Sequence, residues 1–291
     1  NSGIGGSDVA CIMGLNPWKS AYALYAEKHG DVEAEDLSNN EFVYWGTVLE
    51  QVVADRFCEL TGKKVRKCGT LQDESYDFML ANVDRLVVGE SAGLECKTAN
   101  GFKSKDWDGD ELPDSYYCQC QWYMMITGCE KWYIACLIGG NHFVWKEIPR
   151  NDEFISDMRA QAIIFWNNLQ SNIPPEVDGS ESTAATIDKM NKDKLAVDSI
   201  ALPSAAEQYI KCIDGLTATK KVLEEQLAQA QNALKLMLNG SESGVFMDRK
   251  ITYIQIAGRV TLDKKALKKD LPDVYEKYAK VGKPSMRFTL K

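Results

Sequence analysis

The chain has 291 residues, of which 45% are hydrophobic and 26% are charged, and its formal net charge is −8. These values are typical of a globular protein with one large or two modest domains. No apolar run is long enough to cross a bilayer, so we expect neither a membrane anchor nor a membrane partner. Because the chain begins at Asn1 rather than Met, we expect that natural N-terminal residues precede it.

Charge and cysteine usage restrict the possible partners and the compartment. Residues 1–175 carry 15 Lys+Arg against 26 Asp+Glu, whereas residues 249–291 carry 12 against 4. The acidic total argues against a nucleic-acid partner, but the basic end could grip phosphates or could only aid solubility. An odd number of cysteines, nine, predicts reduced thiols and a cytoplasmic setting. Their spacing suits neither a zinc site nor an iron–sulfur cluster.

The N-terminal third is expected to be helical. A glycine-rich turn over 3–8 precedes a short apolar helix over 9–13, which Ser7 or Asp8 can cap. A capped helix start behind glycines can hold a phosphate, although many helices begin this way without a ligand. Residues 20–29 and 40–60 predict two more helices. Glu50 borders the apolar face of the longer one and is either an exposed flank residue or a functional carboxylate.

The central stretch, residues 79–98, predicts a β-hairpin that turns at 89–93. Its first strand carries Asp84, and its second carries Glu95 and Lys97. Strand alternation places Glu95 and Lys97 on one face and Cys96 on the other, and hairpin pairing would bring Asp84 beside Glu95. Two adjacent acids need a cation between them, and hard oxygen ligands suit Mg²⁺. An ordinary surface Glu–Lys pair is the simpler alternative.

The remaining segments predict a mixed α/β domain over 1–175, followed by a linker, a long helix and a basic end over 176–291. Gln119, Gln121 and Tyr123 lie on one of the predicted helices. The long helix is expected to be either a coiled-coil-like arm or a helix folded back on the body. The remaining expected elements are strands over 64–71, 131–138, 141–148, 245–255 and 285–290, helices over 113–126, 151–169 and 204–238, and a loop over 100–113.

Together these motifs, in this order, resemble the PD-(D/E)xK nuclease superfamily. Within it the chain resembles the YqaJ-type viral recombinases, whose best-known relative is the lambda exonuclease. The likeness rests on a helix bearing Glu50, on Asp84, on Glu95-Cys-Lys97 and on Gln119-Cys-Gln-Trp-Tyr123. It covers roughly residues 1–170. It implies a restriction-endonuclease-like core, a mixed central sheet flanked by helices, with a C-terminal helical arm and a basic tail.

The resemblance also implies roles for individual residues. Asp84 and Glu95 would ligate metal with the backbone carbonyl of Cys96, and Glu50 would reach a second ion. Lys97 would position the attacking water. Supporting roles would fall to the following residues: Gln119, Gln121 and Tyr123 would orient the lysine or the strand, and Ser7, with Gly5 and Gly6, would hold a terminal 5′ phosphate.

The implied activity is that of a 5′ to 3′ exonuclease on double-stranded DNA ends. It would use two Mg²⁺ ions, or Mn²⁺ in their place, and leave single strands for a single-strand annealing protein. The implied assembly is a homo-oligomer, a trimeric ring, acting in the cytoplasm of a bacterial host and encoded by a phage or prophage. One departure matters, because the arginine that lambda-type enzymes use for the 5′ phosphate would fall at or before Asn1.

Three other functions remain open. An endonuclease of restriction or repair type would use the same fold, and a DNA-binding or assembly module would use the acids only structurally. A small-molecule metalloenzyme on another α/β fold is the third, but the chain has no nucleotide-cofactor motif and only two histidines.

Overall fold

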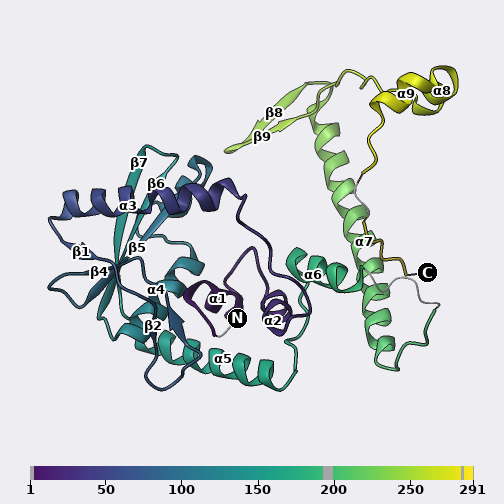
Figure 1. Ribbon diagram of the computed structural model, residues 1–291. Helices are drawn as coiled ribbons and strands as arrows, with labels where there is room; N and C mark the ends of the chain where they lie inside the picture. Colours follow the sequence, from purple (N-terminus) through teal and green to yellow (C-terminus); the bar gives the residue numbers. More distant parts are fainter. Residues whose placement is uncertain (1–2, 193–198, 283–284, 291) are drawn as a thin grey trace. The chain divides into compact units, whose positions relative to one another are not determined.

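The computed structural model describes residues 3–192, 199–282 and 285–290. It divides into two compact units, Asn1–Leu195 and Ala196–Lys291, whose elements are labelled in Figure 1. This division lies later than the predicted boundary at 175. The difference arises because α6 (Glu181–Asn191), which was not predicted, docks on the first unit, where the Thr183 hydroxyl donates a hydrogen bond to the Ser20 hydroxyl at 2.8 Å.

The first unit is built on a mixed five-stranded sheet in the order β1-β4-β5-β6-β7. β5 and β6 are parallel, and the other neighbours are antiparallel. The strands of this sheet are β1 (Val65–Arg66), β4 (Arg85–Val87), β5 (Ala92–Ala99), β6 (Lys131–Ile138) and β7 (His142–Pro149). The predicted mixed sheet and central hairpin are confirmed. The strand predicted over 64–71 is not continuous, because β2 (Leu71–Gln72) pairs separately with β3 (Leu80–Ala81).

Helices cover both faces of the sheet (Figure 1). Along β6, Trp132 and Ile134 face one hydrophobic cluster, whereas Tyr133 and Ala135 face another. This alternation is the two-residue period of a strand buried on both sides. α3 (Glu41–Thr61) covers the second face. The helices that contribute to the first cluster are α1 (Gly6–Ile12), α2 (Ala21–His29), α4 (Asp114–Thr127) and α5 (Asp152–Gln170).

Capping residues determine where these helices begin and end. The Ser20 hydroxyl accepts a hydrogen bond from the Ala23 amide at the start of α2, and Asn40 does the same for the Phe42 and Val43 amides of α3. Gly62 ends α3 in the left-handed conformation, which glycine adopts without strain. The apolar stripe of α3 is less buried than predicted. Only Val53, Ala54 and Phe57 of α3 are buried, and all three lie in the second half of the helix, in the second hydrophobic cluster.

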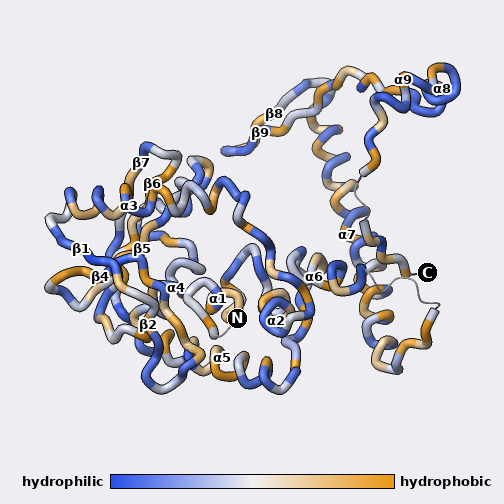
Figure 2. The backbone as a smooth tube through the Cα atoms, viewed as in Figure 1, coloured by the Kyte–Doolittle hydropathy of each residue, from blue (hydrophilic) through white to orange (hydrophobic). Residues whose placement is uncertain are grey.

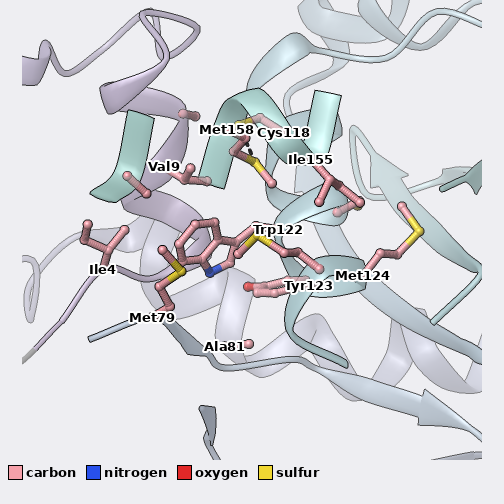
Figure 3. Packing of buried hydrophobic residues seen from close by; sticks show 14 of the residues in the cluster. Ile4, Val9, Met79, Ala81, Cys118, Trp122, Tyr123, Met124, Ile155 and Met158 are labelled. Carbon is pink, nitrogen blue, oxygen red and sulfur yellow. Dashed lines mark hydrogen bonds between the residues drawn. The ribbon is translucent and has the colours of Figure 1, made fainter. Parts of the chain in front are cut away.

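The larger cluster centres on Trp122 of α4, whose indole lies beside Val9 and Met79 in Figure 3. The indole nitrogen donates a hydrogen bond to the Leu80 carbonyl at 2.9 Å. Ile4 and Met79 form a parallel β-bridge, so the segment before α1 is tied to β3. This packing fixes the glycine-rich turn against α4. All nine cysteines are free thiols.

Gly93 on β5 is a position where only glycine fits. A Cβ atom built there would lie 2.1 Å from the ring of Trp132, which is completely buried. We therefore expect Gly93→Ala to lower the free energy of unfolding by about 3 kcal/mol, the upper end for overpacking a core. Urea denaturation measures this loss. The control is Gly69→Ala, where no neighbouring atom lies within 4 Å, and an equal loss in both variants would refute the steric explanation.

The second unit contains α7 (Ala206–Leu238), the hairpin β8 (Ser243–Phe246) and β9 (Arg249–Thr252), and two short helices, α8 (Lys264–Asp270) and α9 (Pro272–Tyr278). The long helix was predicted. The strand expected over 245–255 is instead broken by a turn, so that it contains the end of β8 and all of β9. No strand forms at 285–290, and α8 and α9 occupy the basic stretch. Among the described residues, no helix is both long and apolar enough to cross a membrane.

Candidate active site

The central hairpin brings Asp84 and Glu95 together. In its register Arg85 pairs with Leu94, so Asp84, just before β4, lies opposite Glu95 on the same face. Oδ2 of Asp84 accepts a hydrogen bond from the Cys96 amide at 2.7 Å. The predicted pairing of the two carboxyl groups is therefore present, at one edge of the β4–β5 ladder.

Lys97 links this pair to α4. Its Nζ donates to Oε1 of Glu95 at 2.6 Å and to Oε1 of Gln119 at 3.0 Å, and it lies 4.7 Å from the centre of the Tyr116 ring. The Gln119 amide in turn donates to the Tyr123 hydroxyl at 2.7 Å. Glu95 and Lys97 thus share a face, as alternation predicts, and Gln119 and Tyr123 hold the lysine in one orientation.

Burial makes the two carboxyl groups hard to ionise. Glu95 is only 3% exposed. This burial raises the pKa of Glu95 to about 7, with the Asp84 carboxyl adding to the rise and Lys97 partly opposing it. Burial also raises the pKa of Asp84, against the hydrogen bond from Cys96. For Lys97, burial alone would lower the pKa, but the Glu95 carboxylate outweighs it and the net shift is upward. The site therefore favours bound positive charge.

Arg85 is a site residue that sequence reasoning missed. Its guanidinium is 2% exposed and faces α3, where it forms an ion pair with Glu50 and donates to Oε1 of Gln51 at 3.0 Å. The same group donates to the Asp84 carbonyl at 2.6 Å. Arg85 could have been predicted from the two-residue period of a strand. Because it follows Asp84 directly, its side chain must point to the opposite face of the sheet, which is the face covered by the helix that carries Glu50.

Glu50 consequently lies beside the cluster but is held by Arg85 rather than joined to Asp84 and Glu95. Its negative charge still contributes to the raised pKa of Asp84. Among the described residues, no three His, Cys, Asp or Glu side chains converge as a metal-ligand group. The role implied for Glu50 thus requires it to exchange the guanidinium for a cation.

Gln121 was expected to orient the lysine or the strand, and its hydrogen bonds lead away from Lys97. Its amide donates to the Pro149 carbonyl at 2.9 Å, and its Oε1 accepts from the Asn151 amide at 3.0 Å. Gln121 and Gln119 are two residues apart on a helix, so their side chains point in different directions. Gln121 therefore joins α4 to the end of β7 and the start of α5.

The glycine-rich turn approaches the site through Tyr123. A Cβ atom on Gly6 would lie 2.7 Å from the Tyr123 ring, so α1 can pack this closely only with glycine there. The Gly5 amide donates to Oδ2 of Asp8 at 3.0 Å, and Asp8 pairs with Lys28 at 2.9 Å. Ser7 is exposed in the first turn of α1. The turn is thus adjacent to the Gln119–Tyr123 pair.

The donor set at the hairpin fits a hard divalent cation. Asp84 and Glu95 supply carboxylates, and Cys96 supplies a backbone carbonyl in the same strand. Oε2 of Glu95 is buried and has no hydrogen-bond partner, which is costly unless a ligand satisfies it. Mg²⁺ characteristically uses one or two carboxylates and keeps several waters. Two carboxylates therefore suffice for one such ion.

Comparison with known proteins adds independent information. A family model described as the YqaJ-like viral recombinase domain matches residues 1–130. The uncharacterized protein YqaJ of Bacillus subtilis (strain 168) is 38% identical over 282 residues, which are 96% of this chain and 88% of that protein. The chain belongs to the YqaJ-like viral recombinase family. The matched region includes Glu50, Asp84, the Glu95–Lys97 strand and the Gln119–Tyr123 pair.

Solved structures define the fold of this YqaJ-like chain. The crystal structure of LHK-Exo, an alkaline exonuclease from Laribacter hongkongensis, matches with a TM-score of 0.50 and 20% identity, over 59% of this chain and 89% of that one. The structure of LHK-Exo in complex with dAMP matches over the same shares, with a TM-score of 0.50 and 21% identity. The chain thus shares the α/β fold of LHK-Exo, and the mixed central sheet flanked by helices is the one that the motifs predicted.

Proposed function

We propose that this YqaJ-like protein is a Mg²⁺-dependent deoxyribonuclease that degrades duplex DNA from its ends in the 5′ to 3′ direction. The observation that carries the proposal is the Asp84–Glu95 pair, with Glu95 buried and Asp84 half-buried, and with Lys97 held beside it. Its fold is that of an alkaline exonuclease, and the family is named for viral recombination. The single strands produced would serve an annealing protein in phage recombination, in the cytoplasm of a bacterial host.

The residues divide the chemistry of phosphodiester hydrolysis among them. Asp84, Glu95 and the Cys96 carbonyl would hold Mg²⁺, and Glu50 would reach a second ion after leaving Arg85. Bound Mg²⁺, with Mn²⁺ as a substitute, supplies Lewis-acid stabilisation of the phosphate and of the leaving oxygen. Lys97 brings a fixed ammonium to the same face, where it orients the attacking water and stabilises negative charge. Gln119 and Tyr123 keep that ammonium in place.

End recognition would come from the turn before α1. Ser7 is exposed there, and Gly6 keeps the backbone close to Gln119 and Tyr123 of α4, so Ser7 with Gly5 and Gly6 would hold a 5′ phosphate on the side of α4 that carries Gln119. A processive enzyme would act as a homo-oligomer around the duplex, and a trimeric ring is the arrangement that the family resemblance suggests.

The test is a time course on linear duplex DNA labelled at one end, with Mg²⁺ and with a chelator. We compare a 5′-phosphorylated end, a 5′-hydroxyl end and a closed circle. Mg²⁺-dependent release of nucleotides from the phosphorylated end, with the circle intact, supports the exonuclease. Cutting of the circle would replace it with an endonuclease. Absence of cleavage of every substrate by the folded protein would refute nuclease activity.

A further inference from the structure

α7 carries a continuous apolar stripe with a strict three-four spacing. The spacing places the following residues in line along the helix: Ala206, Tyr209, Ile213, Leu216, Lys220, Leu223, Leu227, Ala230, Leu234 and Met237. These are the a and d positions of a heptad repeat, and Lys220 is their single charged member. In Figure 2 apolar segments recur along α7 among polar ones. We call these ten residues the α7 stripe.

The described residues of its unit leave most of the α7 stripe exposed. Leu216, Leu223 and Leu227 keep 63%, 59% and 60% of their surface exposed. Leu238 is the one buried residue among those of α7, and it packs beside Gly244 of the β8–β9 hairpin. Leucines at such exposure, repeated over about 50 Å of helix, form an apolar surface that needs a partner.

The spacing indicates that the partner is another helix. A stripe that repeats every 3.5 residues stays in register only with a helix that winds around it, whereas a helix packed on a globular body has a 3.6-residue period and a wider apolar face. The available helix with the same length and spacing is α7 of a second copy.

Lys220 sets the orientation of the two helices. In a parallel pair, Lys220 would face Lys220 of the second copy in the core, and like charges there repel. In an antiparallel pair in which residues 206–237 of the two 33-residue helices overlap, Lys220 instead faces Leu223 of the second copy and can reach its Glu224. Glu224 already lies 3.8 Å from Lys220 within one chain.

The same antiparallel register also matches side-chain sizes. Leu216 lies opposite Leu227 of the second copy, and Ile213 lies opposite Ala230. Ile213 and Met237 therefore each face an alanine, and two leucines meet near the middle on either side of Lys220. Tyr209 faces Leu234 between the two alanine layers. Such alternation of volumes allows knobs to fill holes without voids.

We propose that α7 is a dimerisation helix, which joins two copies of this chain through an antiparallel coiled coil along the α7 stripe. This association uses no residue of the Asp84–Glu95 cluster, so it stands or falls independently of the proposed nuclease activity.

The first experiment measures the mass of the full-length protein in solution by light scattering. We expect wild type at an even multiple of the 32.6 kDa chain mass and expect Leu216→Lys/Leu227→Lys to have half the wild-type mass. The matched control is Ala218→Lys/Asn232→Lys, which adds the same charge on the opposite face of α7 and should keep the wild-type mass. A wild type at an odd multiple of the chain mass, whether a monomer or a trimer, or a double variant of unchanged mass, would overturn the proposal and leave α7 folded on its own chain or bound to another protein.

The second experiment tests orientation by disulfide formation in a Cys212→Ser background, since Cys212 is an exposed thiol on α7. Chains with Ile213→Cys are mixed with chains with Ala230→Cys and oxidised. The antiparallel coiled coil predicts cross-linked pairs that contain one chain of each kind. Cross-linking of Ile213→Cys chains to one another would show a parallel pair and refute the proposed orientation. The Cys212→Ser protein alone gives the background.

Discussion

Replacing Lys97 by methionine is expected to slow cleavage of linear duplex DNA by about 100-fold or more while the protein stays folded. The ammonium is held at 2.6 Å from Glu95 and 3.0 Å from Gln119, and methionine keeps the apolar stem without the charge. Single-turnover rates measure the effect, with duplex binding and far-UV circular dichroism measured in parallel. Lys63→Met is the control, since Lys63 is another lysine paired with a glutamate, Glu90, in the same unit.

The Lys97→Met variant should also acquire a pH-dependent loss of stability. Removing the lysine takes away the charge that lowers the pKa of Glu95, which therefore rises further above about 7. A carboxyl group whose pKa is raised by folding stabilises the protein at low pH and loses that contribution as pH rises through the folded pKa. The variant should accordingly be closer to wild type at pH 6 than at pH 8. Wild-type cleavage rates in this variant would mean that Lys97 serves only to neutralise Glu95.

Two substitutions of Glu50 separate its structural role from a catalytic one. Glu50→Ala leaves the buried Arg85 without its carboxylate, and we expect it to cost about 3 kcal/mol of stability. This is the lower end for buried pairs, because Glu50 keeps 28% of its side chain exposed. Glu50→Gln retains an acceptor for Arg85 and should cost only about 1 kcal/mol. Urea denaturation measures both.

The rate of DNA cleavage by the Glu50 variants then shows whether Glu50 has a catalytic role. If Glu50 reaches a cation, Glu50→Gln should cleave at least about 100-fold more slowly than wild type despite its near-normal stability, because a neutral amide is a weak ligand for a hard ion. Gln51→Ala is the control, since it removes the neutral partner of Arg85 on the same helix. Wild-type rates in Glu50→Gln would assign Glu50 to Arg85 alone.

Local pattern was sufficient for much of the site. A strand period of two places Glu95 and Lys97 on one face, and hairpin pairing brings in Asp84, so this cluster could be predicted from spacing alone. The helices predicted over 40–60 and 113–126 end at Gly62 and Gly128. Glycine readily adopts the left-handed conformation that ends a helix, so these ends could be predicted from the sequence. The mixed sheet followed from the order of these elements.

Contacts between segments far apart in the sequence could not be predicted from such local patterns. Glu50 pairs with Arg85 because α3 covers the face of the sheet on which Arg85 lies. Gln119 and Gln121 lie on the same helix but point in different directions, so Gln119 contacts Lys97 and Gln121 contacts Pro149. The apolar face of α3 is largely exposed because only its second half joins a hydrophobic cluster, a limit that periodicity cannot reveal.

The sequence by itself therefore determined the family, the sheet-based fold and the Asp84–Glu95–Lys97 cluster, because each rests on residues close together in the chain or on their order along it. Only the tertiary structure decided that Arg85 holds Glu50, that Gln121 fastens α4 to β7, and that α6 belongs to the first unit. Those outcomes depend on packing between segments far apart in sequence, where side-chain direction and burial, rather than local spacing, select the partner.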